Sequence, residues 1–218
     1  GPRTWAWSGL VGVVLSCVMT AAPAAAQTVT ATVGAGANPF AVALNPVTNR
    51  IYVANRSSNN VTVIDGATNA TTTVVVGADP RSVAVNPVTN RIYVVNNLSN
   101  DVTVIDGGNN SANTFAVGTE PIAVAVNLAT NQVYVANSVS NSISVIDGTV
   151  NAVGSNFVAN GGDFPSVLTV NPLTNHIYTI NINTNNITII TTTTKNTSLL
   201  TTTLTFTQPI FNTANTTL

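Results

Sequence analysis

The sequence has very few charged residues. Only 6% of its 218 residues are Asp, Glu, Lys or Arg, and the formal net charge is -1. The basic residues are scattered along the chain, at Arg3, Arg50, Arg56, Arg81, Arg91 and Lys195. Binding to a nucleic-acid backbone needs clustered Lys and Arg, because the affinity comes from neutralising phosphates and releasing their counterions. We therefore expect no nucleic-acid partner.

Cysteine and histidine are scarcer still. The single cysteine, Cys17, lies in the first segment, which excludes disulfides, cysteine-ligated zinc and a cysteine nucleophile from the rest of the chain. The single histidine, His176, occupies a position that other parts of the chain fill with Arg or Gln, which indicates an exposed polar residue rather than a general base. Calcium loops of the Asp-x-Asp-x-Asp-Gly type are also missing. We expect no catalytic residues, no metal site and no cofactor.

A repeat dominates what the sequence does contain. Residues 45–66 read NPVTNRIYVANRSSNNVTVIDG, and residues 86–107 and 127–148 repeat this pattern as NPVTNRIYVVNNLSNDVTVIDG and NLATNQVYVANSVSNSISVIDG. A weaker fourth copy starts at residue 171, and each copy holds one of the four tyrosines. Prolines at positions 39, 80, 121, 165 and 209 set a period of 41 to 44 residues. Self-similarity at this period indicates a repeat architecture.

Each unit contains four short apolar runs, which in the second unit lie at 82–85, 91–96, 102–105 and 114–117. They are rich in Val, Ile, Thr and Tyr and are bounded by turn-forming residues, which predicts strands. In the turn that opens the repeat, Pro46 presets φ and Asn49 can adopt the left-handed conformation. The inner runs are apolar on both sides, so neighbouring sheets must cover both faces. We therefore predict an all-β fold, a β-propeller of four-stranded antiparallel blades.

The strings IYVAN, IYVVN and VYVAN, followed by VTVIDG or ISVIDG, closely resemble the YVTN-type β-propeller repeat. The resemblance covers about residues 28–190 clearly and the remainder faintly. The marks of WD40 and kelch repeats are absent. The resemblance implies a propeller, usually seven-bladed and usually extracytoplasmic, and it does not by itself imply an activity.

Residues 1–26 have the pattern of a secretory signal peptide. Arg3 gives a basic start, an apolar run too short to span a membrane follows at 10–19, and small residues lead to Ala26. We expect cleavage near Ala26 and a periplasmic or secreted mature chain without a membrane span. Lipid anchoring at Cys17 is the alternative.

The mature chain, 27–218, is predicted to consist of blade units at about 39–79, 80–120, 121–164 and 165–208. Residues 28–34 match the outermost strand of later units and would close the ring, while 209–218 match the start of a further blade. The Thr-rich segment 191–207 leaves open whether the fourth unit is a genuine blade. Because about four units are present, we expect either a fragment of a larger ring or completion by another chain. An open blade edge or face would then self-associate.

Two sets of loops differ most between units: the segments before each first strand and the loops after each second strand. Strand alternation places both sets at one end of the blades, which we call the loop face. Its charged and aromatic residues are our candidates for ligand binding, with ordinary solubilising loop residues as the alternative: Arg56, Asp79, Arg81, Glu120, Asp163 and Phe164. The recurring Asp65, Asp106 and Asp147 indicate turn residues, and the tyrosines indicate packing between blades with each hydroxyl on a backbone partner.

These features together favour a secreted, non-catalytic binding or cell-surface scaffold module, which would use its loop face to bind a protein or carbohydrate ligand. One alternative is a propeller enzyme of the lactone-hydrolysing or quinone-cofactor kind, with its catalytic residues in missing blades. Another is a structural component of a surface layer, suggested by the charge-poor, Thr- and Asn-rich composition.

Overall fold

The computed structural model describes residues 28–158, 163–191 and 200–205, which form strands and turns without a helix. The chain divides into two compact units, Gly1–Thr32 and Val33–Leu218. Of the first unit, only residues 28–32 are described, and they form no strand. The predicted signal segment 1–26 and the predicted start of a further blade at 209–218 lie outside the described residues. In the described part of the chain, no helix has the length and apolarity needed to cross a membrane.

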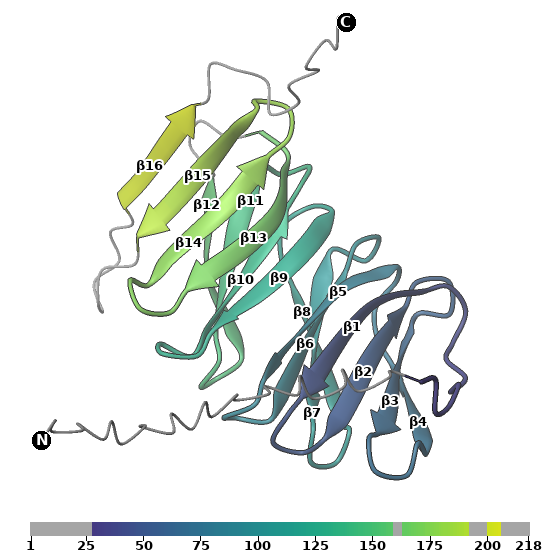
Figure 1. Cartoon of the computed structure of the whole chain (residues 1–218). Coiled ribbons are helices and arrows are strands. Elements are labelled where there is room, and N and C mark those ends of the chain that lie inside the picture. The colour runs from purple at the N-terminus through teal and green to yellow at the C-terminus, as the bar shows by residue number, and fades with distance from the viewer. Residues whose placement is uncertain (1–27, 159–162, 192–199, 206–218) are drawn as a thin grey trace, which may run out of the picture. The chain divides into compact units, whose positions relative to one another are not determined.

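The second unit contains four antiparallel sheets, each made of four consecutive strands (Figure 1). Blade 1 consists of β1 (Pro39–Asn45), β2 (Arg50–Asn55), β3 (Asn60–Asp65) and β4 (Thr71–Val75). Blade 2 consists of β5 (Pro80–Asn86), β6 (Arg91–Asn96), β7 (Asp101–Asp106) and β8 (Ala112–Ala116). Blade 3 consists of β9 (Pro121–Asn127), β10 (Gln132–Asn137), β11 (Ser142–Asp147) and β12 (Ala152–Val158). Blade 4 consists of β13 (Pro165–Asn171), β14 (His176–Asn181), β15 (Asn186–Thr191) and β16 (Leu200–Thr205).

The predicted all-β propeller architecture is confirmed. The four runs predicted in the second unit correspond to β5–β8, and the Thr-rich region contributes β16, which pairs antiparallel with β15. Residues 28–34, predicted as a closing outer strand, form no strand. The third strand of every blade already pairs with a fourth strand from its own blade, so no third strand in the described unit has a free edge for this segment.

The first strand of each blade begins with a proline and a break in register. Pro80 pairs with Asn96, but the regular register resumes only at Ser82, and the same shift occurs at the start of β1, β9 and β13. Proline has no N–H to donate to a ladder, so it is confined to strand ends, edges and bulges. The repeated proline therefore marks where each innermost strand starts.

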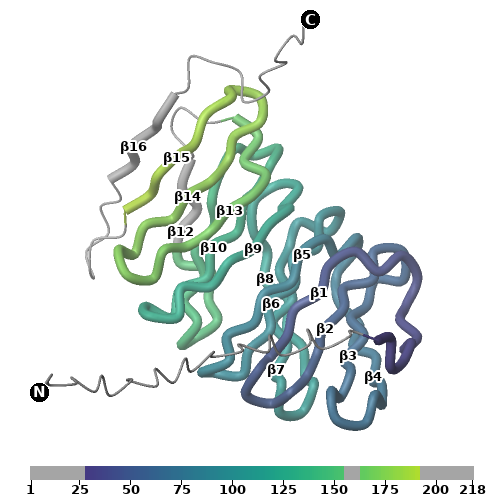
Figure 2. The backbone as a smooth tube through the Cα atoms, viewed as in Figure 1, coloured from purple at the N-terminus to yellow at the C-terminus, as the bar shows by residue number. Residues whose placement is uncertain are grey.

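The first strands of successive blades lie beside one another, β1 next to β5, β5 next to β9 and β9 next to β13 (Figure 2). The hydrophobic core lies between the sheets. Tyr93 and Val95 of blade 2 are fully buried in a cluster with Val133, Val135 and Ile146 of blade 3. The expectation that neighbouring sheets cover the apolar inner strands is therefore confirmed for the contact between blades 2 and 3.

Asparagine shapes the turn that opens each repeat. Asn49 has φ of 52°, the left-handed conformation predicted for it. The first asparagine of the motif, Asn45, accepts a hydrogen bond from the backbone N–H of Val47 at 3.0 Å through Oδ1. Its Nδ2 also donates to Oδ1 of Asn90 in the next blade at 2.8 Å, and Asn86 and Asn131 repeat this bond between blades 2 and 3 at 2.8 Å. The motif thus forms a turn and also joins two blades.

A second asparagine, at the end of the second strand, is buried beneath a glycine in blades 1 to 3. Nδ2 of Asn96 donates to Oδ1 of Asp101 at 2.7 Å and to Oγ1 of Thr103 at 2.9 Å. A Cβ on Gly77 would lie 2.5 Å from Oδ1 of Asp101 and 2.7 Å from Nδ2 of Asn96. The glycine before the first strand is therefore required by close packing in blades 1 to 3, where Gly36 and Gly118 meet the same kind of contacts as Gly77.

We predict that Gly77→Ala lowers the free energy of unfolding by roughly 1–3 kcal/mol, because the added methyl group must displace a buried hydrogen-bonded cluster. Gly34→Ala is the matched control, since a Cβ at Gly34 would meet nothing within 4 Å. Urea denaturation of both variants measures the difference. Equal stability of the two variants would contradict the packing role of Gly77.

Candidate functional site

The loop face is built by hydrogen bonds between the two variable loop sets. In blade 2 the backbone N–H of Asn97, after β6, donates to the carbonyl of Asp79, before β5, at 3.0 Å. The equivalent bonds in the other blades measure 2.9 Å for Arg56 to Asn38, 3.0 Å for Ser138 to Glu120 and 3.2 Å for Ile182 to Phe164. Backbone contacts therefore hold both loop sets at the same end of each blade, and the side chains differ between blades.

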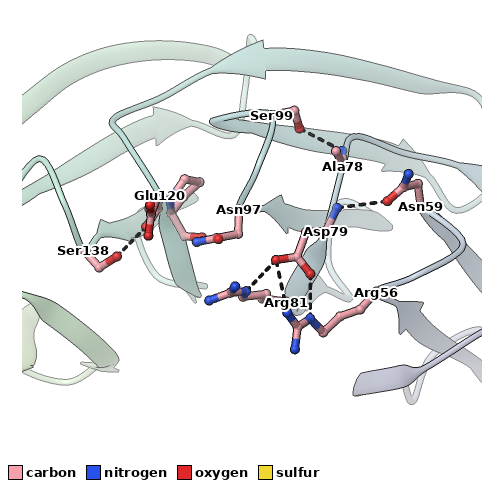
Figure 3. A network of polar contacts seen from close by, with 10 residues as sticks. Arg56, Asn59, Ala78, Asp79, Arg81, Asn97, Ser99, Glu120 and Ser138 are labelled. Atoms are coloured by element: carbon pink, nitrogen blue, oxygen red, sulfur yellow. Dashed lines mark hydrogen bonds and ion pairs between the residues drawn. The ribbon is translucent and has the colours of Figure 1, made fainter.

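Three of the six predicted ligand-binding residues form one charged cluster (Figure 3). Nε of Arg56, in the loop after β2, lies 2.6 Å from Oδ1 of Asp79, and Nη2 lies 3.4 Å from Oδ2. Nε of Arg81, in β5, lies 2.8 Å from Oδ2 of the same carboxylate. Arg56 also stacks on the ring of Phe40 at 5.0 Å. The cluster joins blade 1 to blade 2.

The Asp79 side chain is only 8% exposed, whereas the Arg56 and Arg81 side chains are 31% and 26% exposed. Burial is the largest single influence on the pKa of Asp79 and would raise it, but the hydrogen bonds and charges of Arg56 and Arg81 together outweigh burial and hold the pKa below its ordinary value. Asp79 is therefore ionised at neutral pH. Two guanidinium groups and one carboxylate leave the cluster with one net positive charge.

The other three predicted residues lie on later blades and make separate contacts. Glu120 and Phe164 occupy the position of Asp79 in blades 3 and 4, with φ of 48° and 58°, and their backbone N–H groups donate to Oδ1 of Asn100 and of Asn141. Oδ2 of Asp163 accepts a hydrogen bond from Nδ2 of Asn183 at 3.3 Å. Among the described residues, no hydrogen bond or ion pair connects these three to the arginine cluster.

Sequence reasoning missed Asn97. It occupies the position of Arg56 in blade 2, it is 1% exposed, and its Nδ2 donates to the carbonyl of Pro121 in blade 3 at 3.0 Å. The residue at this position therefore crosses to the next blade in both cases, by an ion pair or by an amide. Aligning the repeats on Arg56 would have pointed to Asn97.

The recurring aspartates act as turn residues, as predicted. Oδ1 of Asp65 accepts hydrogen bonds from the backbone N–H groups of Ala67 and Thr68, both at 3.0 Å, and the pKa of Asp65 is lowered mainly by these bonds. Asp106 and Asp147 make the same kind of contact, with Gly108 and Thr149 at 2.8 Å.

Tyr52, Tyr93 and Tyr134 pack between blades, and the hydroxyls of Tyr93 and Tyr134 bind side chains, whereas a backbone partner was expected. Tyr93 donates to Oδ1 of Asn151 at 3.4 Å and Tyr134 to Oε1 of Gln132 at 2.7 Å. The backbone groups beside these two tyrosines pair with the neighbouring strands, so the hydroxyls bind side chains instead. His176 is half-buried and packs edge-on against Tyr178, with ring centroids 6.2 Å apart. Within the described ranges, no group of three His, Cys, Asp or Glu residues could hold a metal ion.

Comparison with known protein families shows to which propeller family the chain belongs. A model of the family described as lactonase, seven-bladed β-propeller, matches residues 65–210. The chain belongs to this family. The YVTN-type repeat remains a prediction from the repeat strings. No curated protein sequence matches the chain.

Solved structures of propeller proteins match at low sequence identity. Hydrazine synthase of Kuenenia stuttgartiensis is 23% identical with a TM-score of 0.64, over 75% of this chain and 49% of that one. A protein of unknown function from Desulfotomaculum acetoxidans is 15% identical with a TM-score of 0.65, over 78% and 56%. A proposed 6-phosphogluconolactonase from Bacteroides uniformis is 14% identical with a TM-score of 0.60, over 76% and 56%. These matches show the fold, and the chain spans about half the length of each structure.

We predict that Asp79→Asn destabilises the protein by roughly 1–3 kcal/mol at pH 7, because two guanidinium groups lose their anionic partner. Asn is suited to the left-handed backbone at this position, where φ is 57°. The folded-state pKa lies below the ordinary value of 3.8, so this stabilisation exists above that value and is lost as pH falls through the folded pKa.

Chemical denaturation at pH 7 and at pH 3 measures the effect. The difference between wild type and variant should become smaller in acid. Asp163→Asn, on the same face but outside the cluster, is the control and should change stability by less than about 0.5 kcal/mol. A difference between wild type and Asp79→Asn that is the same at both pH values would contradict this role.

Proposed function

We propose that the protein is a secreted, non-catalytic β-propeller that binds a small carbohydrate-derived ligand with an anionic group through its loop face. The observation that carries the proposal is the cluster of Arg56 and Arg81 around one buried carboxylate. Asp79 uses Nε of both arginines and Nη2 of Arg56, which leaves the other guanidinium N–H groups on partly exposed side chains. Arginine presents its donors in a planar fork that fits carboxylate and phosphate groups.

The contrast between the two ends of the blades supports this location. At the opposite end, an aspartate recurs at the same position in blades 1, 2 and 3 and is occupied by turn hydrogen bonds. On the loop face, the residues before the four prolines are Asn38, Asp79, Glu120 and Phe164. A face that differs from blade to blade can recognise an asymmetric ligand, whereas an end that repeats cannot distinguish one blade from the next.

The state of the Asp79 carboxylate favours binding over catalysis by this residue. A general base needs a carboxylate that can accept a proton near the working pH. Asp79 is held between two guanidinium groups that lower its pKa, so it is a weak base. We assign it the role of positioning Arg56 and Arg81.

Hydrolysis of a lactone is the second candidate function, supported by membership of the lactonase family. The two candidates share a ligand class, because opening a sugar lactone yields a sugar acid with a carboxylate. They differ in whether the purified protein consumes a lactone. The proposed 6-phosphogluconolactonase among the similar structures suggests 6-phosphogluconolactone as the lactone to assay.

We predict that isothermal titration calorimetry detects binding of 6-phosphogluconate or gluconate, and that Arg81→Gln weakens it about tenfold through loss of a charge-assisted hydrogen bond. Arg91→Gln is the matched control. Arg91 also pairs with an aspartate, Asp106, at 2.9 Å and is similarly exposed, but it lies at the start of β6, at the other end of the blade. It should change binding by less than twofold.

Equal weakening by the two substitutions, or binding of neither sugar acid, would overturn the proposed site. Turnover of 6-phosphogluconolactone by the wild-type protein would replace the binding proposal with the lactonase candidate.

A further inference from the structure

The residue before the first-strand proline has a left-handed backbone in all four blades. Its φ runs from 48° to 58° at Asn38, Asp79, Glu120 and Phe164. In blades 2, 3 and 4 the backbone N–H at this position donates to an asparagine Oδ1 of the previous blade, at 3.0, 2.8 and 2.9 Å. The carbonyl at this position accepts a backbone N–H from the loop after the second strand. Hydrogen bonds of the backbone itself therefore fix this conformation, whichever side chain stands there.

Two of these four residues are unsuited to the left-handed conformation. Fifteen non-glycine residues in the described ranges have positive φ, and all except Glu120 and Phe164 are Asn or Asp. Asn and Asp adopt the left-handed region more readily than other residues, and a bulky side chain there is an outlier. Asn38 shows that asparagine fits this position of the repeat. Glu120 and Phe164 thus carry backbone strain that the fold does not require, and strain of this kind is concentrated at functional sites.

The contacts of the two side chains within the fold do not explain their presence. Glu120 is exposed, and the hydrogen bonds that it makes among the described residues come from its backbone N–H and carbonyl. Phe164 is half-buried, and its ring belongs to none of the three hydrophobic clusters in the described part of the chain. Both side chains are therefore available to a ligand.

Glu120 and Phe164 continue the loop face from the arginine cluster. They stand directly before β9 and β13, as Asp79 stands directly before β5. The strand β9 lies beside β5 on one side and beside β13 on the other (Figure 2). From blade 2 to blade 4, the loop face therefore presents a cationic cluster, then a carboxylate, then an aromatic ring.

A ligand that matches this order carries an acid group, hydroxyls and an apolar ring face. An ionised carboxylate only accepts hydrogen bonds, so Glu120 suits hydroxyl groups, which donate them. The face of an aromatic ring is negative and attracts the C–H groups on one side of a sugar ring. We propose that the loop face binds a sugar acid in its ring form, with the acid group at Arg81, ring hydroxyls at Glu120 and one face of the ring on Phe164. This inference rests on the binding function proposed above and names the form of its ligand.

Substitution by asparagine tests whether these side chains serve the fold or the ligand. Glu120→Asn should raise the urea midpoint of unfolding by roughly 0.2–0.5 M, because Asn is suited to the left-handed backbone, and Phe164→Asn should not lower the midpoint. Asn69→Glu is the matched reverse control. Asn69 has φ of 62° and is exposed in the turn between β3 and β4, at the end of the blade opposite the loop face, which we call the turn end. Asn69→Glu should lower the midpoint by a similar amount.

Isothermal titration calorimetry with two sugar acids tests the ligand contacts. Glucuronate keeps the sugar ring, whereas gluconate is an open chain. Phe164→Asn should weaken the binding of glucuronate by about fivefold or more and that of gluconate by less than about twofold, because only the ring offers a face for stacking. Glu120→Asn should weaken the binding of both by about fivefold or more, because both carry hydroxyls. Asn69→Glu should leave both affinities within about twofold of wild type.

A lower urea midpoint in either asparagine variant would overturn the proposal, because the side chain would then serve the fold. Unchanged glucuronate affinity in either variant would also overturn it. If Arg81→Gln still weakens binding in that case, the proposed anion site stands without these two contacts. Failure of the wild-type protein to bind either sugar acid would overturn both the proposed function and this inference.

Discussion

The contact between neighbouring blades is the interaction on which the rest of the structure depends. The clusters of buried hydrophobic residues lie between sheets, and each draws its members from two blades, as Tyr93 of blade 2 and Ile146 of blade 3 illustrate. A single four-stranded sheet therefore has no core of its own. Each sheet must therefore pack against the next blade with one face and against the previous blade with the other. This double requirement explains why the same residue types return in every unit of a repeat protein.

The requirement also explains why the fold could be predicted from the sequence. The period of the prolines, one tyrosine per unit and apolar runs on both sides of the inner strands are direct consequences of stacking sheets, and Asn49 has the conformation that the turn motif predicts. The bond from Asn45 to Asn90 could not be predicted. The motif contains two asparagines, and nothing in its spacing shows that the first of one unit faces the second of the next.

The candidate site was predictable in its location but not in its chemistry. Strand alternation placed the variable loops at one end, and the backbone bond from Asn97 to Asp79 bears this out. Asp79 and Glu120, however, look alike in sequence. They differ in the structure because the residue that crosses from the previous blade is Arg56 in one case and Asn97 in the other. The guanidinium forms an ion pair with the carboxylate of Asp79, whereas the amide of Asn97 binds the backbone carbonyl of Pro121.

Different groups form the hydrogen bonds at the two ends of the blades. At the turn end, side chains such as Asn45 and Asn86 carry the connection between blades, so substitution there would loosen the stack. At the loop face, backbone groups hold the loops together within each blade, and the side chains that project from them can differ without breaking those bonds. Sequence variation is therefore tolerated at the loop face. A recognition function can reside there because the backbone bonds that hold the loops do not depend on which side chain stands at each position.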